Sequence, residues 1–197
     1  MQFYRPAYYD TFRCTASACS DNCCIGWEID IDPDTADRYR AFAGPLGEEL
    51  ARKVDWQAEP PHFINRPNGR CPFLDEENLC RMIRSAGEGA LCRICDRHPR
   101  FFNWMPGVTE AGLGLCCEEA ARLLLESPLP DRFICTPAPA GLPEGEADCG
   151  EALAQALASL RQVLFHIAAD TAYPFPIRCV MATEFSGNSC EFCFILI

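Results

Sequence analysis

The segment CTASACSDNCCIGWEIDID, residues 14–32, holds cysteines at positions 14, 19, 23 and 24, and the last two are adjacent. Adjacent Cα atoms lie about 3.8 Å apart across a trans peptide, whereas a disulfide requires about 4.4–6.8 Å. Cys23 and Cys24 are therefore not expected to bond to each other, and we expect their side chains to serve different partners. An alternative for Cys24 is that it acts as a small buried hydrophobic residue.

The whole chain of 197 residues contains 15 cysteines and 3 histidines. The N-terminus lacks an apolar stretch after a basic start, and the chain lacks a run of about eighteen apolar residues. We therefore expect a cytoplasmic protein without a membrane span. Because thiols stay reduced in the cytosol, metal ligands explain these cysteines better than a disulfide scaffold does.

Composition and charge narrow the class of partner. A hydrophobic content of 49% with 23% charged residues is typical of a soluble globular protein. The formal net charge of −11 argues against binding to nucleic acid or to an anionic membrane surface, because both attract basic patches. A basic protein substrate fits the sign of the charge.

Local patterns predict a mainly α-helical fold with a few short strands. Helices are predicted over residues 32–42, where Asp32 is a candidate N-cap before Pro33, and over residues 45–54 and 116–127. Another is predicted over residues 151–171, where apolar residues recur at three- and four-residue spacing: Leu153, Leu157, Leu160, Leu164 and Ile167. Residues 27–31 alternate as a short strand does.

The domain prediction follows from the same reading of the chain. Residues 1–126 are expected to form a cysteine-rich metal-binding domain. Residues 127–150 are rich in proline and are expected to form a linker or loop. Residues 151–197 are expected to form a C-terminal helical segment. The fold is thus predicted to be organised around a metal centre.

The spacing of the cysteines indicates metal-binding chemistry. Beyond the first group, cysteines pair at 71 and 80, at 92 and 95 and at 116 and 117, and LCRIC is a C-x2-C motif. Four thiolates suit structural zinc and an iron–sulfur cluster alike, and the spacings match neither a zinc ribbon nor a ferredoxin. The histidines, His62, His98 and His166, are predicted to be structural or solvated.

The residues alone identify no catalytic group. The stretch EAGLGLCCEEA, residues 110–120, is the nearest approach to a glycine-rich donor loop, but we expect a plain turn before a helix there, without a preceding strand. Methyl transfer to an amine usually needs a group that accepts a proton. Tyr8, Tyr9, Asp30 and Asp32 lie near the first cysteine group, and none of them is favoured.

Four motifs in order resemble the flagellin lysine-N-methylase family of bacteria. They are RPAYYDTFRC leading to CCIGWEIDID, then CPFLDEENLC, LCRICDRHPR and LGLCCEEAARLLLE, which together cover residues 1 to about 125. The first and third motifs also resemble a broader group of small zinc- or iron-chelating proteins. Residues 150–185 resemble the family more weakly.

The resemblance implies an enzyme, a protein-lysine N-methyltransferase. It would methylate lysine side chains of flagellin in the cytoplasm, with S-adenosylmethionine as the donor and flagellin as the protein partner. It also implies cysteine ligands of an iron–sulfur centre, with zinc as the alternative. The implied ligands are Cys14, Cys19, Cys23, Cys24, Cys71, Cys80, Cys92, Cys95 and Cys117, whereas Cys116 falls where the family usually has serine.

Two further expectations concern function. Family members are longer than this chain, and the last stretch, SGNSCEFCFILI, does not resemble them, so we expect a truncated form with weak methylase activity by itself. The alternative is a metal-binding module without catalysis. In either case the remaining cysteines are expected not to bind the centre; they are Cys135, Cys149, Cys179, Cys190 and Cys193.

Overall fold

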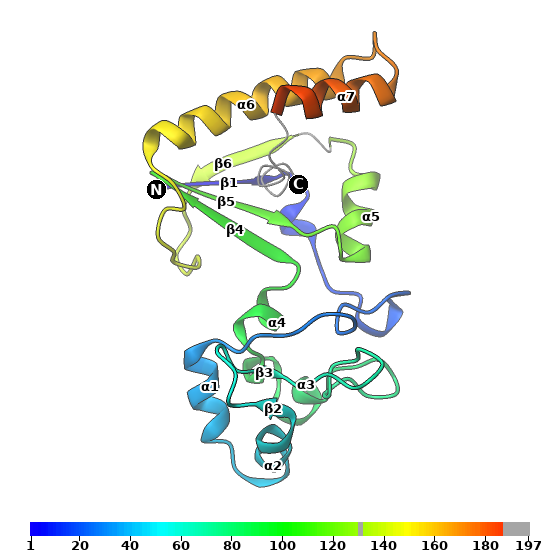
Figure 1. Ribbon diagram of the computed structural model, residues 1–197, viewed down its shortest axis with the longest axis vertical. Helices are drawn as coiled ribbons and strands as arrows, with labels where there is room; N and C mark the ends of the chain where they lie inside the picture. The colour runs from blue at the N-terminus through cyan, green and yellow to red at the C-terminus, as the bar shows by residue number, and fades with distance from the viewer. Residues whose placement is uncertain (130–131, 187–197) are drawn as a thin grey trace. The chain divides into compact units, whose positions relative to one another are not determined.

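The structure is a computed structural model that describes residues 1–129 and 132–186 (Figure 1). Its contacts divide the chain into two compact units. The sheet unit comprises residues 1–9, 102–112 and 132–186, and the cysteine unit comprises residues 10–101 and 113–129. The sequence analysis predicted domain boundaries at residues 126 and 150, and these boundaries stay a prediction.

The sheet unit is built on four strands in the order β4-β5-β1-β6. Their bounds are β1 Gln2–Pro6, β4 Arg100–Met105, β5 Val108–Leu113 and β6 Phe133–Pro137. The strand β1 pairs in parallel with β5 and antiparallel with β6, where Tyr4 stands opposite Cys135. Gly107, with a φ of 74°, makes the tight turn between β4 and β5, a backbone conformation that favours glycine.

Two helices complete the sheet unit: α6 Glu151–Ala169 and α7 Phe175–Ser186. Figure 1 shows α6 along the sheet near β6, with α7 folded back beside α6. Arg161 of α6 donates two hydrogen bonds to Glu110 of β5, at 2.6 and 3.0 Å, and Phe165 stacks on Phe133 of β6. Leu157 and Leu164 are the buried positions of the predicted amphipathic helix, which is confirmed.

By length and composition alone, α6 is also the one helix among the described residues that could cross a membrane. Its mean hydropathy is 1.2, and 11% of the apolar stretch is buried. The core helix of a soluble protein meets the same criterion.

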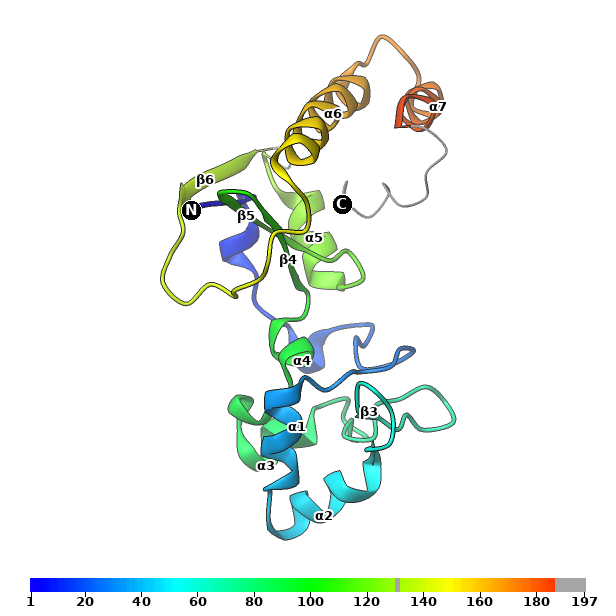
Figure 2. The same cartoon turned by 60° about the vertical axis from the view of Figure 1, so that its left-hand side comes forward.

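The cysteine unit consists of short helices joined by long loops. Its helices are α1 Pro33–Arg40, α2 Gly44–Lys53, α3 Arg81–Ala86, α4 Arg93–Arg97 and α5 Glu118–Glu126, and its strands are β2 Val54–Asp55 and β3 His62–Phe63. Three-residue 3-10 turns lie at η1 Tyr9–Thr11, η2 Ala16–Ala18 and η3 Glu88–Ala90. Helices α1 and α2 pack against each other (Figure 2).

The helix predictions that rest on capping are confirmed. The Asp32 side chain accepts a hydrogen bond from the backbone N–H of Thr35, at 3.1 Å, and Pro33 is the first residue of α1. The core behind α1 is aromatic: Phe63 lies between the rings of Tyr39 and Phe73, and the Tyr39 hydroxyl donates to the Ala90 carbonyl at 2.7 Å. The buried hydroxyl is thereby satisfied, as burial requires.

The strand content differs in part from the prediction. The fold is a mixture of helices with a four-stranded sheet, because β6 lies within the segment for which proline content predicted only a loop. A strand, β5, also leads into the glycine-rich stretch and includes its residues 110–113, where no strand was expected. The predicted strand at residues 27–31 is reduced to a single bridge between Asp30 and His62, although Ile29 and Ile31 are buried on either side of it.

Candidate metal centre

Five cysteines converge on the core of the cysteine unit, and we call them the inner set: Cys24, Cys71, Cys80, Cys92 and Cys95. Cys71 and Cys92 are buried within the hydrophobic core, and the other three pack against it. All five come from motifs that the sequence analysis identified. The core therefore gathers sulfur from three segments that lie up to 71 positions apart in the chain.

Local hydrogen bonds fix these segments. The backbone N–H of Cys71 donates to the Cys24 carbonyl at 2.8 Å, which joins the first two motifs directly. The CPFLDEENLC loop closes on itself through a bridge between Leu74 and Cys80. Inside that loop the carboxylate of Asp75 accepts from two backbone N–H groups, including that of Leu79 at 2.9 Å. The polar residues of the loop thus serve to return the chain to Cys80.

Three of the predicted ligands stand at helix N-caps: Cys80 before α3, Cys92 before α4 and Cys117 before α5. The positive end of a helix dipole stabilises a thiolate. For Cys92, the backbone N–H of Cys95 also favours the ionised sulfur. At Cys92 the backbone therefore supplies partial positive charge to the sulfur.

Two pairs of thiols share a proton in the absence of a metal. Cys95 donates to Cys92, which lowers the pKa of Cys92 and raises that of Cys95. Cys24 donates to Cys23, and with the imidazole of His98 this lowers the pKa of Cys23 to about 4, while the pKa of Cys24 is raised. In each pair the shared hydrogen bond thus favours one thiolate and one thiol.

Burial also disfavours ionisation of the Cys71 thiol. Desolvation raises the pKa of its thiol to about 11, although the N–H groups of Phe73 and Leu74 oppose the shift. Burial therefore favours the thiol form of Cys71 at neutral pH. Binding of a metal would remove this proton, because the thiolate is the ligand.

A second group of sulfurs lies at the surface of the cysteine unit, and with one histidine we call it the outer set: Cys14, Cys23, Cys117 and His98. Burial raises the pKa of Cys117, and the nearby thiols of Cys23 and Cys14 raise it further. Cys14 and Cys23 are exposed, whereas Cys117 is half-buried. Cys19, the remaining predicted ligand, donates instead to the carboxylate of Glu118, at 3.2 Å.

His98 was predicted to be structural, and that stays a prediction. Its ring packs against Trp27, with centroids 5.9 Å apart, and it lies beside the sulfur of Cys23. Its Nε2 atom is buried and has no hydrogen-bond partner in the described part of the chain. In the sequence His98 stands three residues after Cys95, just beyond the C-x2-C motif.

The other cysteines lie apart from both sets or outside the described residues. Cys135 on β6, Cys149 and Cys179 on α7 belong to the sheet unit. Cys116 is exposed in the turn before α5. Cys190 and Cys193 lie outside the described residues.

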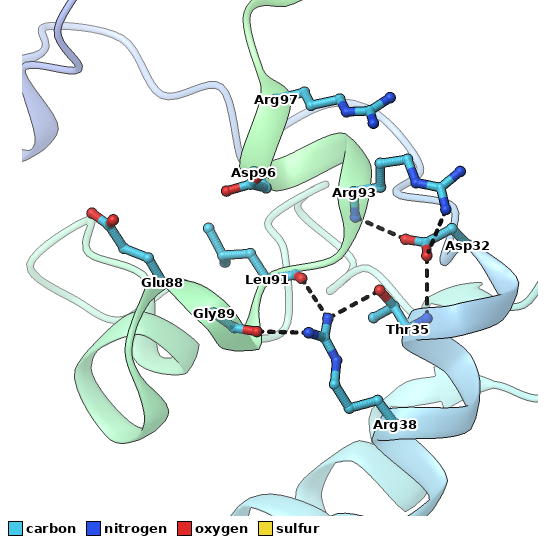
Figure 3. Close-up of a pocket in the computed structure, with 9 residues that line it drawn as sticks. All are labelled: Asp32, Thr35, Arg38, Glu88, Gly89, Leu91, Arg93, Asp96 and Arg97. Carbon is cyan, nitrogen blue, oxygen red and sulfur yellow. Dashed lines mark hydrogen bonds and ion pairs between the residues drawn. The ribbon is translucent and has the colours of Figure 1, made fainter. Parts of the chain in front are cut away.

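A shallow hollow of about 280 Å³ lies beside α4, and Arg93, Asp96 and Arg97 of this helix are among the residues that line it (Figure 3). Its walls are joined by Asp32, which accepts hydrogen bonds from the backbone N–H of Arg93 as well as from α1. Arg38 donates to the carbonyls of Gly89 and Leu91. These contacts hold α4, and with it the C-x2-C motif, against α1.

One group of carboxylate and imidazole side chains could also hold a metal ion. Glu28, Asp30 and His62 bring their ligand atoms within 4.8 Å of one another at the surface, and His62 Nε2 lies 3.3 Å from Glu28. Within residues 1–129 and 132–186, no three cysteine sulfurs lie within 4.8 Å of one another. The sulfurs of the inner set are thus spread more widely than the ligands of this surface group.

Comparison with known proteins assigns the chain to a family. The chain is 33% identical over 129 residues to the flagellar biosynthetic protein FliU of Salmonella muenchen, which covers 62% of this chain and 76% of that protein. The chain belongs to the flagellin lysine-N-methylase family. The lysine-N-methylases of Salmonella typhimurium (strain LT2) and Salmonella choleraesuis (strain SC-B67) are also 33% identical over 129 residues.

The extent of the match differs between these relatives. The chain covers only 32% of the length of each of the two lysine-N-methylases. No protein-family profile matches the chain, and no solved structure matches it. The flagellin lysine-N-methylase family is therefore assigned through its sequence relatives.

Proposed function

We propose that the chain acts in the S-adenosylmethionine-dependent N-methylation of flagellin lysines in the cytoplasm, and that its inner set holds an iron–sulfur centre. The single observation that carries the centre is the convergence of five cysteines from three motifs on one hydrophobic core. The names of the relatives support the methylase activity and the flagellar partner. The net charge of −11 suits a cationic lysine-bearing surface.

The spread of the sulfurs favours a cluster over a single zinc ion. Four sulfurs bound tetrahedrally to one zinc at about 2.3 Å lie about 3.8 Å from one another. In the described part of the chain, no three cysteine sulfurs come within even 4.8 Å of one another. A cluster suits this spacing better, because each sulfur binds a different iron atom.

The charge and burial of the inner set also suit an iron–sulfur cluster. The backbone N–H of Cys95 lowers the cost of thiolate charge at Cys92, and the surrounding core excludes water from Cys71 and Cys92. An iron–sulfur centre, when bound, supplies one-electron chemistry and a rigid link between the segments that hold it. Asp75 and Asp32 orient the segments that carry Cys80 and Cys92 through their backbone hydrogen bonds.

A second candidate function is a metal-binding module without catalysis. It is favoured by the five cysteines that converge on one core, because binding of a metal by them needs no catalytic group. Both candidates predict metal on the inner set, and they differ only in donor binding and methyl transfer.

The test is anaerobic purification of the chain followed by iron and sulfide analysis, S-adenosylmethionine binding by calorimetry, and methylation of purified flagellin. We expect a brown protein with iron and sulfide that binds the donor and transfers methyl groups to flagellin. A metal-loaded chain that neither binds the donor nor methylates flagellin would instead support the module. A colourless protein with stoichiometric zinc would contradict the iron–sulfur assignment.

A further inference from the structure

Two carboxylates and an imidazole converge at the surface of the cysteine unit. Glu28, Asp30 and His62 each bring one ligand atom within 4.8 Å of the other two, and His62 Nε2 lies 3.3 Å from the Glu28 carboxylate. Two ligands bound to one ion at about 2.1 Å, with an angle of about 90–109° between them, lie about 3.0–3.4 Å apart. The distance between His62 and Glu28 therefore suits coordination to a shared ion.

The backbone holds the three side chains on one face of a short β-ladder. The bridge between Asp30 and His62 lies between two backbone hydrogen bonds, donated by Phe63 to the Ile29 carbonyl at 3.1 Å and by Ile31 at 2.7 Å. The side chains of a pair in this position lie closer together than those of a hydrogen-bonded pair. Ile29, Ile31 and Phe63 alternate with the three ligand residues and are buried in the core. The core thus anchors the backbone that carries the ligands.

Negative charge is in excess on this face. Asp55 of β2 pairs with His62 from the other side of β3, and residues opposite each other in an antiparallel pair share a face, so it adds a third carboxylate. No lysine or arginine of residues 1–129 and 132–186 forms an ion pair with Glu28, Asp30 or Asp55. The imidazole carries at most one positive charge. A divalent cation at this position would relieve the repulsion between the carboxylates.

We propose that Glu28, Asp30 and His62 bind one divalent transition-metal ion at a site that uses no cysteine. Oxygen ligands suit Mg²⁺, Ca²⁺ and Mn²⁺, whereas imidazole suits transition metals, so the mixed set favours a transition metal such as Mn²⁺. Glu28 and Asp30 are exposed, and three protein ligands leave coordination positions open to water or to an oxygen-bearing ligand. The ion also ties residues 28–30 to β3. The inference goes beyond the proposed function and does not depend on it.

The test is titration of Mn²⁺ into the full-length, anaerobically purified protein, followed by the electron paramagnetic resonance signal of the free ion. Mn²⁺ is the probe because it prefers oxygen ligands to thiolates, so the cysteines compete little for it. We expect one Mn²⁺ to bind per chain. The pulsed spectrum of the bound ion should contain a coupling to an imidazole nitrogen.

Matched variants separate coordination from a general change of charge. Glu28→Gln, Asp30→Asn and His62→Gln should each weaken Mn²⁺ binding by at least about tenfold, because loss of even an outer-shell partner typically weakens binding by that much. His62→Gln should also remove the nitrogen coupling. Glu48→Gln on α2 and His166→Gln on α6 make the same chemical changes at exposed positions, and both should bind Mn²⁺ as the parent does.

The iron and sulfide content of every variant should equal that of the parent, because none of the changes removes a cysteine. The proposal is overturned if the parent binds no Mn²⁺ at one per chain with a Kd below about 1 mM. It is also overturned if the control variants weaken binding as much as Glu28→Gln and His62→Gln do. Loss of iron from Glu28→Gln or His62→Gln would mean that these side chains support the cysteine centre, and it would overturn the separate site.

Discussion

The cysteines of this chain differ in burial, and we expect them to differ in their contribution to the free energy of folding. Cys92 is fully buried in the core, whereas Cys149 is half-buried in a loop of the sheet unit. Binding of a structural metal contributes on the order of 10 kcal/mol to folding, and whole domains are stable by only about 5–15 kcal/mol. A ligand in the core therefore matters far more than a cysteine in a loop.

We predict that Cys92→Ser loses metal from the inner centre and becomes sensitive to protease. Cys149→Ser serves as the control and should change the free energy of unfolding by less than about 0.5 kcal/mol, as surface substitutions usually do. Metal analysis and limited proteolysis of the two purified proteins measure the difference. Equal metal content and equal proteolysis would remove Cys92 from the ligand set.

The sequence could predict which cysteines cluster but not how the clusters divide. Local turns bring Cys92 to Cys95 and Cys71 to Cys80, so spacing alone predicted those pairs. Cys24 packs against the core while the adjacent Cys23 is exposed, and this difference follows from tertiary packing. The packing of His98 against Trp27, which lies 71 positions earlier in the chain, is likewise not visible in the spacing.

At the scale of elements, one carboxylate joins two helices of the cysteine unit. Asp32 caps α1 through the N–H of Thr35 and accepts from the N–H of Arg93, the first residue of α4. Burial opposes ionisation of Asp32, but these hydrogen bonds outweigh it and hold the pKa below its usual range. Asp32 therefore stays ionised at neutral pH, where it stabilises both helix ends.

We predict that Asp32→Ala lowers the free energy of unfolding by about 1–3 kcal/mol, because a helix cap and a second charge-assisted hydrogen bond are lost together. Asp37→Ala, at an exposed position of the same helix, is the matched control and should cost less than about 0.5 kcal/mol. Urea denaturation at pH 7 measures both. A cost for Asp32→Ala no greater than that of the control would show that the cap is dispensable.

The helices could be predicted because their signals lie within each segment. The sheet could not, because its strands pair over long distances in the sequence. The bounds of α1, α2, α5 and α6 follow from caps and apolar spacing within each segment. The strand β6 is stabilised by its partner β1, where Tyr4 stands opposite Cys135 across 131 positions of sequence. Proline content therefore predicted a loop at residues 133–137, because no feature of that segment alone identifies its partner.

At the scale of the whole molecule, the chain assembles each compact unit from separated segments. The sheet unit takes three of them, and its C-terminal segment is attached by Arg161 on α6 and Glu110 on β5. The side chains of this pair are only 15% and 14% exposed. Removing one partner of such a buried ion pair leaves an uncompensated charge, which typically costs about 3–5 kcal/mol.

We predict that Arg161→Met loosens α6 from the sheet while the inner centre keeps its metal, because all the inner cysteines belong to the cysteine unit. Hydrogen exchange should become faster in the amides of α6 and β6 and remain unchanged in those of α1 and α2. The double variant Arg161→Met/Glu110→Leu should recover most of the loss, since it replaces the ion pair by apolar contact. Faster exchange in α1 and α2, with loss of iron, would mean that the two units unfold as one, and the metal centre would then depend on the sheet as well as on its own ligands.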